Sequence, residues 1–208
     1  GNEQSNKARM LARLEAEDVA FEWIDATGFL AQTIEDHAGF ADLILLSRDA
    51  EGALFPHMAD VTGELLVRLG RPMLVVPPDA GALNLYGTAM IAWDGSADAE
   101  YALQAAVPLL RHVSRATLYC VDDGSAGLPV EEAARYLSRH GVEPAIEREP
   151  AGMDRPGAAI LAKAQSGSFD YVVMGAFGRS RALERIFGGA TRTMLEQSPI
   201  PVFLAHRR

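Results

Sequence analysis

Near its C-terminus the chain reads Tyr171-Val-Val-Met-Gly-Ala-Phe-Gly-Arg-Ser-Arg-Ala-Leu-Glu-Arg-Ile-Phe-Gly-Gly-Ala-Thr191. The first four residues form an apolar run typical of a buried strand, and residues 190–197 have the pattern of a helix. Three glycines, Gly175, Gly178 and Gly188, lie between them, separated by two and then nine residues. Glycine lets backbone N–H groups approach an anion closely, and a helix start adds free N–H donors and the positive end of a dipole. The stretch therefore predicts a strand, an anion-binding loop and a helix.

This stretch resembles the G-x2-G-x9-G-[S/T] nucleotide loop of the universal stress protein family. The resemblance extends over roughly residues 86–205 and includes the ending Ser198-Pro-Ile-Pro-Val-Phe-Leu204. One position differs, because Gly189 stands where the family has Ser or Thr, and Thr191 follows two residues later. The resemblance implies a nucleotide-binding α/β domain. A glycine-rich loop that only turns the chain is the alternative.

The chain is acidic overall but basic around these glycines. Its formal net charge is −9, which disfavours nucleic acid as a partner, because a phosphate backbone binds cationic surfaces. Within residues 175–195 a single glutamate, Glu184, stands against four arginines: Arg179, Arg181, Arg185 and Arg192. A cluster of basic residues in an acidic protein is typical of a site for a small anion. For Arg181 and Arg185 a solvated helix face is the alternative.

The rest of the composition gives a broad class. About half of the 208 residues are apolar, which suffices for packed cores, and no apolar run approaches the roughly 20 residues of a membrane span. The first residues are polar and do not resemble a signal peptide. A single cysteine, Cys120, excludes an internal disulfide and fits a reducing compartment. We therefore expect a cytoplasmic protein without a membrane partner, with Cys120 as a core strand residue.

Two parts of the chain share one pattern of elements. In the second part, the apolar strand after Asp170 is followed about thirty residues later by Ile200-Pro-Val-Phe-Leu204. In the first part, the strand after Asp42 is followed at a similar spacing by Arg71-Pro-Met-Leu-Val-Val76. A helical stretch precedes each copy, over residues 30–38 and 156–165. A repeat of this length, with whole strand–helix–strand units, indicates tandem domains rather than a solenoid.

The second copy, which we call the C-terminal repeat (residues 85–208), alternates strands and helices throughout. Strands are expected over residues 88–93, 116–121, 142–148, 171–174 and 200–204. Helices are expected over residues 97–111, 130–140, 156–165 and 190–197, with Gly141 ending the second helix at its C′ position. This alternation predicts a doubly wound, parallel α/β sheet. The resemblance implies the strand order 3-2-1-4-5.

The first copy, which we call the N-terminal repeat (residues 1–80), is incomplete. It opens with an expected helix over residues 7–17 and a strand over residues 19–24. The strand–helix–strand that precedes these elements in the other copy is absent. Because the chain opens on Gly1 rather than Met, we expect either a shortened chain or further residues upstream of this numbering. The segment over residues 77–81, rich in proline, is the expected linker.

Superposing the copies predicts that only one of them binds a ligand. The positions of Gly175, Gly178, Arg179 and Gly188 are taken in the N-terminal repeat by Ser47, Ala50, Glu51 and Asp60. Two carboxylates would then lie where phosphates should bind, which electrostatics disfavours. We therefore expect a degenerate, non-binding N-terminal repeat and at most one nucleotide per chain.

Ligands of open α/β sheets bind beyond the carboxyl ends of strands, where the strand order reverses. The resemblance implies that strands one and four of the C-terminal repeat meet there, ending at Asp94 and Gly175. The family places an aspartate at the end of strand one against adenine and ribose, and Asp94 occupies that position. Main-chain groups at the end of strand two, around Val121, complete the expected base site. An Asp94-Gly95 turn followed by Ser96 as helix N-cap is the structural alternative.

The resemblance implies that the phosphates bind the glycine-rich loop and the following helix start. The residues concerned are Gly178, Arg179, Gly188, Gly189, Ala190 and Thr191. Asp122 and Asp123 follow strand two at the same rim. They are either ordinary surface carboxylates or, with a phosphate, ligands of Mg²⁺.

No dedicated catalytic constellation is present in the sequence. The five histidines show no metal-ligand spacing, and the chain lacks a P-loop, a dinucleotide fingerprint and a nucleophile elbow. The Ser-Gly-Gly-x-Asp-Ser loop of related ATP pyrophosphatases is also absent. We therefore expect a stress-response module that binds ATP or another adenine nucleotide and responds to it. Slow nucleotide hydrolysis and a dimer scaffold that binds no nucleotide are the alternatives.

The last strands of the two repeats, Pro72–Val76 and Pro201–Leu204, are apolar and each begins with proline. Proline is tolerated at the first residue of a strand or on an edge, and exposed apolar edges invite pairing. Family members pair through their fifth strands. We therefore expect these two strands to pair within one chain, and chains to associate further as a homodimer through other faces.

Overall fold

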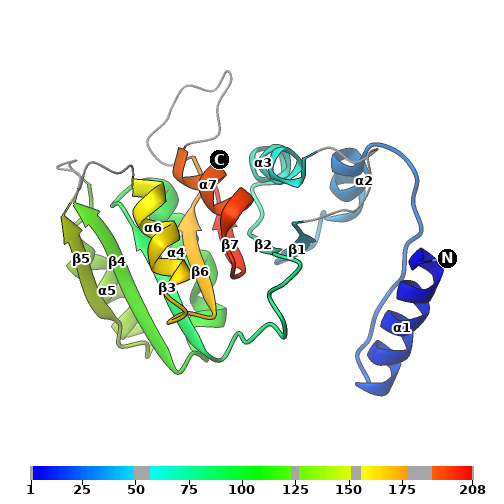
Figure 1. Cartoon of the computed structure of the whole chain (residues 1–208), viewed down its shortest axis with the longest axis horizontal. Coiled ribbons are helices and arrows are strands. Elements are labelled where there is room, and N and C mark those ends of the chain that lie inside the picture. Colours follow the sequence, from blue (N-terminus) through cyan, green and yellow to red (C-terminus); the bar gives the residue numbers. More distant parts are fainter. Residues whose placement is uncertain (1, 49–56, 123–126, 151–155, 178–188, 208) are drawn as a thin grey trace.

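The computed structural model describes residues 2–48, 57–122, 127–150, 156–177 and 189–207. These residues form one seven-stranded sheet in the order β1-β2-β7-β6-β3-β4-β5, accompanied by helices (Figure 1). The strands are β1 (Ile44–Ser47), β2 (Met73–Val76), β3 (Thr88–Trp93), β4 (Arg115–Asp122), β5 (Ala145–Pro150), β6 (Tyr171–Gly175) and β7 (Val202–Ala205). The helices are α1 (Asn2–Ala16), α2 (Leu30–His37), α3 (Met58–Leu69), α4 (Ala97–Leu110), α5 (Val130–Arg139), α6 (Pro156–Gln165) and α7 (Gly189–Gln197).

The C-terminal repeat has the predicted fold. Its five strands run parallel in the order β5-β4-β3-β6-β7, which is 3-2-1-4-5 when they are numbered within the repeat. The doubly wound α/β prediction is therefore confirmed. Gly141 ends α5 with a φ of +80°, and the N–H groups of Gly141 and Val142 donate to carbonyls of the last helical turn. Because Val142 belongs to this turn, β5 begins at Ala145, later than expected.

The N-terminal repeat adds the parallel pair β1 and β2 to the same sheet. β2 runs antiparallel to β7, the last strand of the C-terminal repeat. The same backbone hydrogen bond is found in both repeats. Ile44 N–H donates to Pro72 O at 3.0 Å at the start of β1, and Val172 N–H donates to Pro201 O at 2.9 Å in β6. The two strand pairs are thus related by an approximate two-fold axis, and one sheet continues through both repeats.

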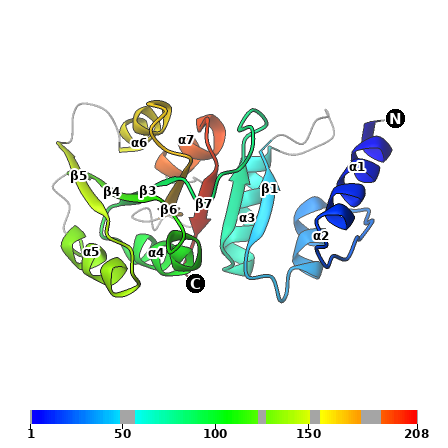
Figure 2. The same ribbon diagram turned by 90° about the horizontal axis from the view of Figure 1, so that it is seen from below.

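Each face of the sheet has its own helices (Figure 2). On one face α2, α3, α6 and α7 enclose a core that extends from Ile44 in β1 to Tyr119 in β4. On the other face α4 and α5 cover the C-terminal repeat around Leu103 and Leu118. Burial from both sides explains why the strands β3 and β6 are nearly continuous apolar runs.

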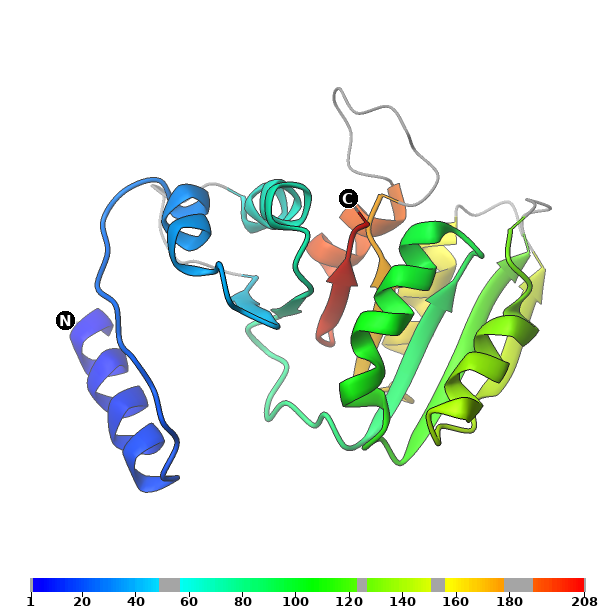
Figure 3. The ribbon, with the colours of Figure 1, turned by 180° about the vertical axis from the view of Figure 1, so that it is seen from behind.

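The predicted strand over residues 19–24 is wrong. These residues have no regular secondary structure, and they expose Phe21 and Trp23 among other apolar side chains. A strand needs a neighbour for its backbone hydrogen bonds, and none of the described strands lies beside this segment. The segment instead runs back along α1, where Lys7 pairs with Asp25 and lies 5.1 Å from the Trp23 ring. Figure 3 shows both elements standing apart from the sheet.

Candidate functional site

The carboxyl ends of β3, β4 and β6 meet at one edge of the sheet. β3 lies between β4 and β6, with Trp93 opposite Cys120 and Ala92 opposite Met174. This edge is the point at which the chain order of the strands reverses, as the sequence predicts. Asp94 directly follows β3, and Val121 is the second-to-last residue of β4. The predicted base-site residues therefore lie on neighbouring strands.

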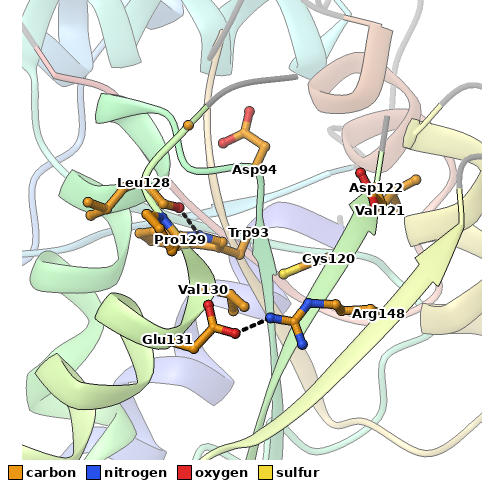
Figure 4. A pocket seen from close by; sticks show the side chains of 11 residues that line it. Trp93, Asp94, Cys120, Val121, Asp122, Leu128, Pro129, Val130, Glu131 and Arg148 are labelled. Carbon is orange, nitrogen blue, oxygen red and sulfur yellow. Dashed lines mark hydrogen bonds and ion pairs between the residues drawn. The ribbon is translucent and has the colours of Figure 1, made fainter. Parts of the chain in front are cut away.

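A pocket of about 230 Å³ opens beside these strand ends (Figure 4). β3 and β4 form one side of it, and the segment leading into α5 forms the other. Its lining residues are Trp93, Asp94, Cys120, Val121, Asp122, Gly127, Leu128, Pro129, Val130, Glu131 and Arg148. Asp94 and Val121, both predicted as nucleotide contacts, share this pocket.

The wall opposite β3 is fixed by two hydrogen bonds. Trp93 Nε1 donates to Leu128 O at 3.0 Å, and Leu128 N–H donates to Gly95 O at 3.0 Å. Gly95 has a φ of +71°, and a Cβ there would lie 2.5 Å from Leu128 N. Only glycine therefore allows this close approach. Contacts within the chain, one of them from the Trp93 side chain, therefore hold this wall of the pocket.

Asp94 forms the turn that the sequence offers as an alternative, and it also lines the pocket. Its Oδ1 accepts a hydrogen bond from Ser96 N–H at 2.9 Å, and Ser96 Oγ accepts one from Ala99 N–H at 3.1 Å. Ser96 is therefore the N-cap of α4, as the structural alternative expected. The Asp94 carboxylate nevertheless lines the pocket. The turn orients this side chain and does not remove it from the site.

Gly175 is explained by packing. A Cβ at this position would lie 2.5 Å from Ala99 N and 2.5 Å from the carbonyl carbon of Asp98. The start of α4 therefore rests directly on the end of β6, and Gly175 does not line the pocket. Its absent side chain serves the helix–strand contact.

The first turn of α7 contains Gly189, Ala190 and Thr191. Gly189 is exposed, and a Cβ there would meet no atom within 4 Å, so packing does not require glycine at this position. Thr191 is only 3% exposed, and its hydroxyl accepts a hydrogen bond from Phe177 N–H at 3.3 Å. The Thr191 side chain thus holds the turn after β6, where Phe177 has a φ of +67°. N–H groups of the first turn of a helix lack intrahelical partners, so α7 offers them at this edge.

Several predicted residues lie outside the described residues. Gly178, Arg179 and Gly188 of the proposed phosphate site are among them, as is Asp123. Asp122 lines the pocket. Within the part of the chain that the structure describes, no group of three or more His, Cys, Asp or Glu side chains could hold a metal ion.

Glu131 and Arg148 form a charged pair that no motif in the sequence predicts. Glu131 lies in the first turn of α5, and Arg148 in β5 forms a hydrogen-bonded ion pair with it. A bond with its own backbone N–H and the bond from Arg148 lower the pKa of Glu131. Between this pair and Asp94 lies Cys120, whose pKa burial raises to about 11, so its thiol is neutral. The pairing of β4 with β5 brings Arg148 close to Cys120. No local pattern in the sequence predicts this proximity.

The superposition of the two repeats needs one correction. Ile44 pairs with Met73, 29 positions later, whereas Val172 pairs with Val202, 30 positions later. The connection in the N-terminal repeat is therefore one residue shorter. Asp60, in the first turn of α3, corresponds to Gly189 rather than to Gly188.

Across the boundary between the repeats, Asp60 acts on α7. The pKa of Arg192 is raised, mainly by its hydrogen bond with Glu196 at 2.7 Å and additionally by the charge of Asp60. The charge of Asp60 in the N-terminal repeat therefore reaches Arg192 in α7.

Residues 85–206 match the family model described as the universal stress protein family. The chain belongs to this family. Universal stress protein Slr1230 of Synechocystis sp. is 27% identical over 186 residues, which cover 85% of this chain and 62% of that protein. The chain thus spans less than two thirds of the length of this relative.

Two solved structures resemble the fold over nearly the whole chain. A universal stress protein from Archaeoglobus fulgidus is 22% identical, with a TM-score of 0.74, over 100% of this chain and 80% of its own. A protein from Pseudomonas aeruginosa, described as a putative universal stress protein, is 18% identical, with a TM-score of 0.54, over 97% and 78%. None of the described helices is long and apolar enough to cross a membrane.

Proposed function

We propose that this universal stress protein binds one adenine nucleotide per chain in its C-terminal repeat and acts as a nucleotide-responsive module. The observation that carries the proposal is the pocket itself. Asp94 and Val121, expected at the base site from the sequence, line one pocket at the edge where the strand order reverses. The start of α7, with its N–H donors, belongs to the same edge.

The charge of the pocket favours one orientation of the nucleotide. Three carboxylates, those of Asp94, Asp122 and Glu131, line it against the single guanidinium of Arg148. Such a pocket repels phosphates and accepts groups that donate hydrogen bonds. We therefore place base and ribose in the pocket and the phosphates toward α7 and the glycine-rich loop.

The N-terminal repeat differs from the C-terminal repeat at the positions expected to bind phosphate. Asp60 stands where α7 has Gly189, and Ser47 stands at the end of β1 where β6 ends in Gly175. A carboxylate in the first turn of a helix competes with a phosphate for its N–H groups. This supports a stoichiometry of one nucleotide per chain.

Calorimetric titration with ATP, ADP, AMP and inorganic triphosphate tests the proposal. We expect one site per chain, with Asp94→Ala weakening the adenine nucleotides by about 10- to 100-fold, because it removes a charge-assisted hydrogen bond. The same variant should hardly change triphosphate binding. Gly178→Val should abolish binding of both ligand types while the protein remains folded.

Asp79→Ala is the matched control, because Asp79 is exposed and does not line the pocket. A stoichiometry near two would contradict the selectivity between the repeats. Adenine nucleotides that bind Gly178→Val as tightly as the parent protein would show that the loop is only a turn. Mass spectrometry of freshly purified, denatured protein identifies which nucleotide is carried along.

A further inference from the structure

A histidine near the C-terminus lies at the same edge of the sheet as the carboxyl end of β6. His206 directly follows β7, and Ala205, the last residue of β7, pairs with Gly175, the last residue of β6. Figure 3 shows β7, β6 and α4 side by side in this part of the molecule. Neither the glycine-rich motif nor the family match assigns a role to this histidine.

His206 is held by an aspartate of α4. Its Nδ1 lies 2.8 Å from Asp98 Oδ1 and 3.2 Å from Ala176 O. Both partners are acceptors, so Nδ1 carries the hydrogen. Asp98 Oδ1 also accepts a hydrogen bond from Arg207 N–H at 2.8 Å. The side chains of His206 and Asp98 are only 23% and 14% exposed, and solvent ions screen such a pair less than an exposed one.

The ring of His206 contacts a strained turn. Phe177 has a φ of +67°, which a bulky residue rarely adopts, so the surrounding contacts must hold it. The Phe177 and His206 rings meet edge to face, with centroids 5.3 Å apart. Ala176 N–H donates to Ala205 O at 2.9 Å, and Phe177 N–H donates to the Thr191 hydroxyl. The turn thus connects His206 to the first turn of α7.

Among the charged groups on the neighbouring elements, Asp98 is the one that contacts the ring. Glu100 on α4 and Arg192 on α7 each bond to a residue of their own helix. Arg207 reaches Asp98 through its backbone, and residues 172–177 have no ionisable side chain. Protonation of His206 therefore converts its bond with Asp98 into an ion pair.

We propose that His206, held by Asp98, is a pH-sensitive positioning residue for the phosphate-binding end of the nucleotide site. The inference rests on the proposed function, because the turn at Phe177 leads to the helix start that is proposed to bind phosphate. Histidine ordinarily changes its charge between about pH 5 and pH 8. Protonation strengthens the bond to Asp98 and adds a positive charge at this edge of the sheet. Both effects favour an anion, so nucleotide affinity should rise as the pH falls.

Calorimetric titration of the full chain with ATP and with inorganic triphosphate, at about pH 6 and about pH 8, tests this assignment. The ratio of the two affinities is compared between proteins, because the ionisation of the ligand itself contributes equally to each. We expect this ratio to be about 5-fold larger in the parent protein than in His206→Gln, whose amide can donate to Asp98 but takes up no proton. Asp98→Asn should also lower the ratio, because the imidazolium loses its charged partner.

Proton uptake gives a second measurement of the same linkage. Titrations in two buffers of different ionisation enthalpy report how many protons are taken up on binding. The parent protein should take up more than His206→Gln, because the ligand favours the protonated histidine.

His112→Gln is the matched control, because His112 is exposed, follows the opposite end of α4 and packs its ring against Tyr86. It should keep the parent ratio, and thermal unfolding checks that each variant keeps the fold. A His206→Gln variant with the parent ratio and the parent proton uptake would overturn the inference and leave nucleotide binding standing. A parent protein that binds neither ligand at either pH would overturn both the inference and the proposed function.

Discussion

The strand pairs β1-β2 and β6-β7 share one backbone arrangement and differ in their surroundings. β6 lies between β7 and β3, and α4 covers one of its faces, whereas β1 pairs with β2 alone among the described strands. The difference appears at equivalent positions, because Val173 in β6 is fully buried and Leu45 in β1 is 58% exposed. The same kind of strand residue is core or surface according to its neighbours.

The comparison also separates packing from ligand binding at a glycine of the motif. Gly175 and Ser47 are equivalent, since they are opposite Ala205 and Val76 at the ends of their strands. Gly175 lies under the start of α4, where a Cβ would meet Ala99. Ser47 is exposed, on the same face of β1 as Leu45. The glycine in β6 thus reflects the helix above it, and its absence from β1 is weak evidence about nucleotide binding.

Exchanging these two residues should have the largest effect on stability. Gly175→Ser forces a side chain against the backbone of α4, which cannot move aside as a side chain could, and we expect a loss of about 3 kcal/mol. Ser47→Gly should cost less than about 1 kcal/mol, mainly from backbone entropy. Urea unfolding of both variants measures the difference. Equal losses of unfolding free energy in the two variants would show that packing against α4 does not require glycine at position 175.

Truncating the equivalent apolar side chains should have a smaller effect. Val173→Ala leaves a cavity in a packed core, and we expect a loss of about 2 kcal/mol. Leu45→Ala removes a larger side chain but should cost less than about 1 kcal/mol, because much of that side chain is already in water. Unfolding by urea under identical conditions makes the comparison direct. If Leu45→Ala is the more costly change, the open side of β1 is covered in solution.

The alternation of strands and helices sufficed to predict the C-terminal repeat, because each of its elements has a partner within the chain. The same reasoning failed for residues 19–24, where the apolar pattern is that of a strand but no described strand pairs with it. Local pattern reports what a segment can form. Whether it does so depends on its neighbours, which the pattern does not contain.

The candidate site could be predicted only in part, for a related reason. Asp94 and Val121 follow from their places at strand ends, and the structure puts both in one pocket. The opposite wall depends on the approach of Leu128 to Gly95, and Arg148 enters through the register between β4 and β5. Both depend on contacts between backbone segments that are far apart in the sequence. Thr191 was predicted at the right helix start, yet its buried hydroxyl bonds to Phe177, a contact that spacing does not reveal.

The smallest expected effect concerns the aspartates that precede the equivalent strands. Asp170 Oδ2 accepts hydrogen bonds from Thr88 N–H at 2.6 Å and from the Thr88 hydroxyl at 2.9 Å. The backbone bond is the main cause that lowers the pKa of Asp170. Asp42 precedes β1, is exposed, and has no strand corresponding to β3 beside it among the described residues. The repeats should therefore differ in how acid affects them.

A carboxyl whose pKa is lower in the folded state than its unfolded value near 4 stabilises the fold above that value. The contribution is lost as the pH falls through the lower, folded pKa, because the unfolded chain binds the proton first. We therefore expect Asp170→Asn to reduce the loss of unfolding free energy between about pH 6 and about pH 3, since the titrating group is gone. Asp42→Asn, at the exposed equivalent position in the N-terminal repeat, is the matched comparison. Urea unfolding across this pH range measures the unfolding free energy of both variants. If Asp170→Asn loses as much of it on acidification as the parent protein does, the hydrogen bond from Thr88 does not hold the carboxylate in solution.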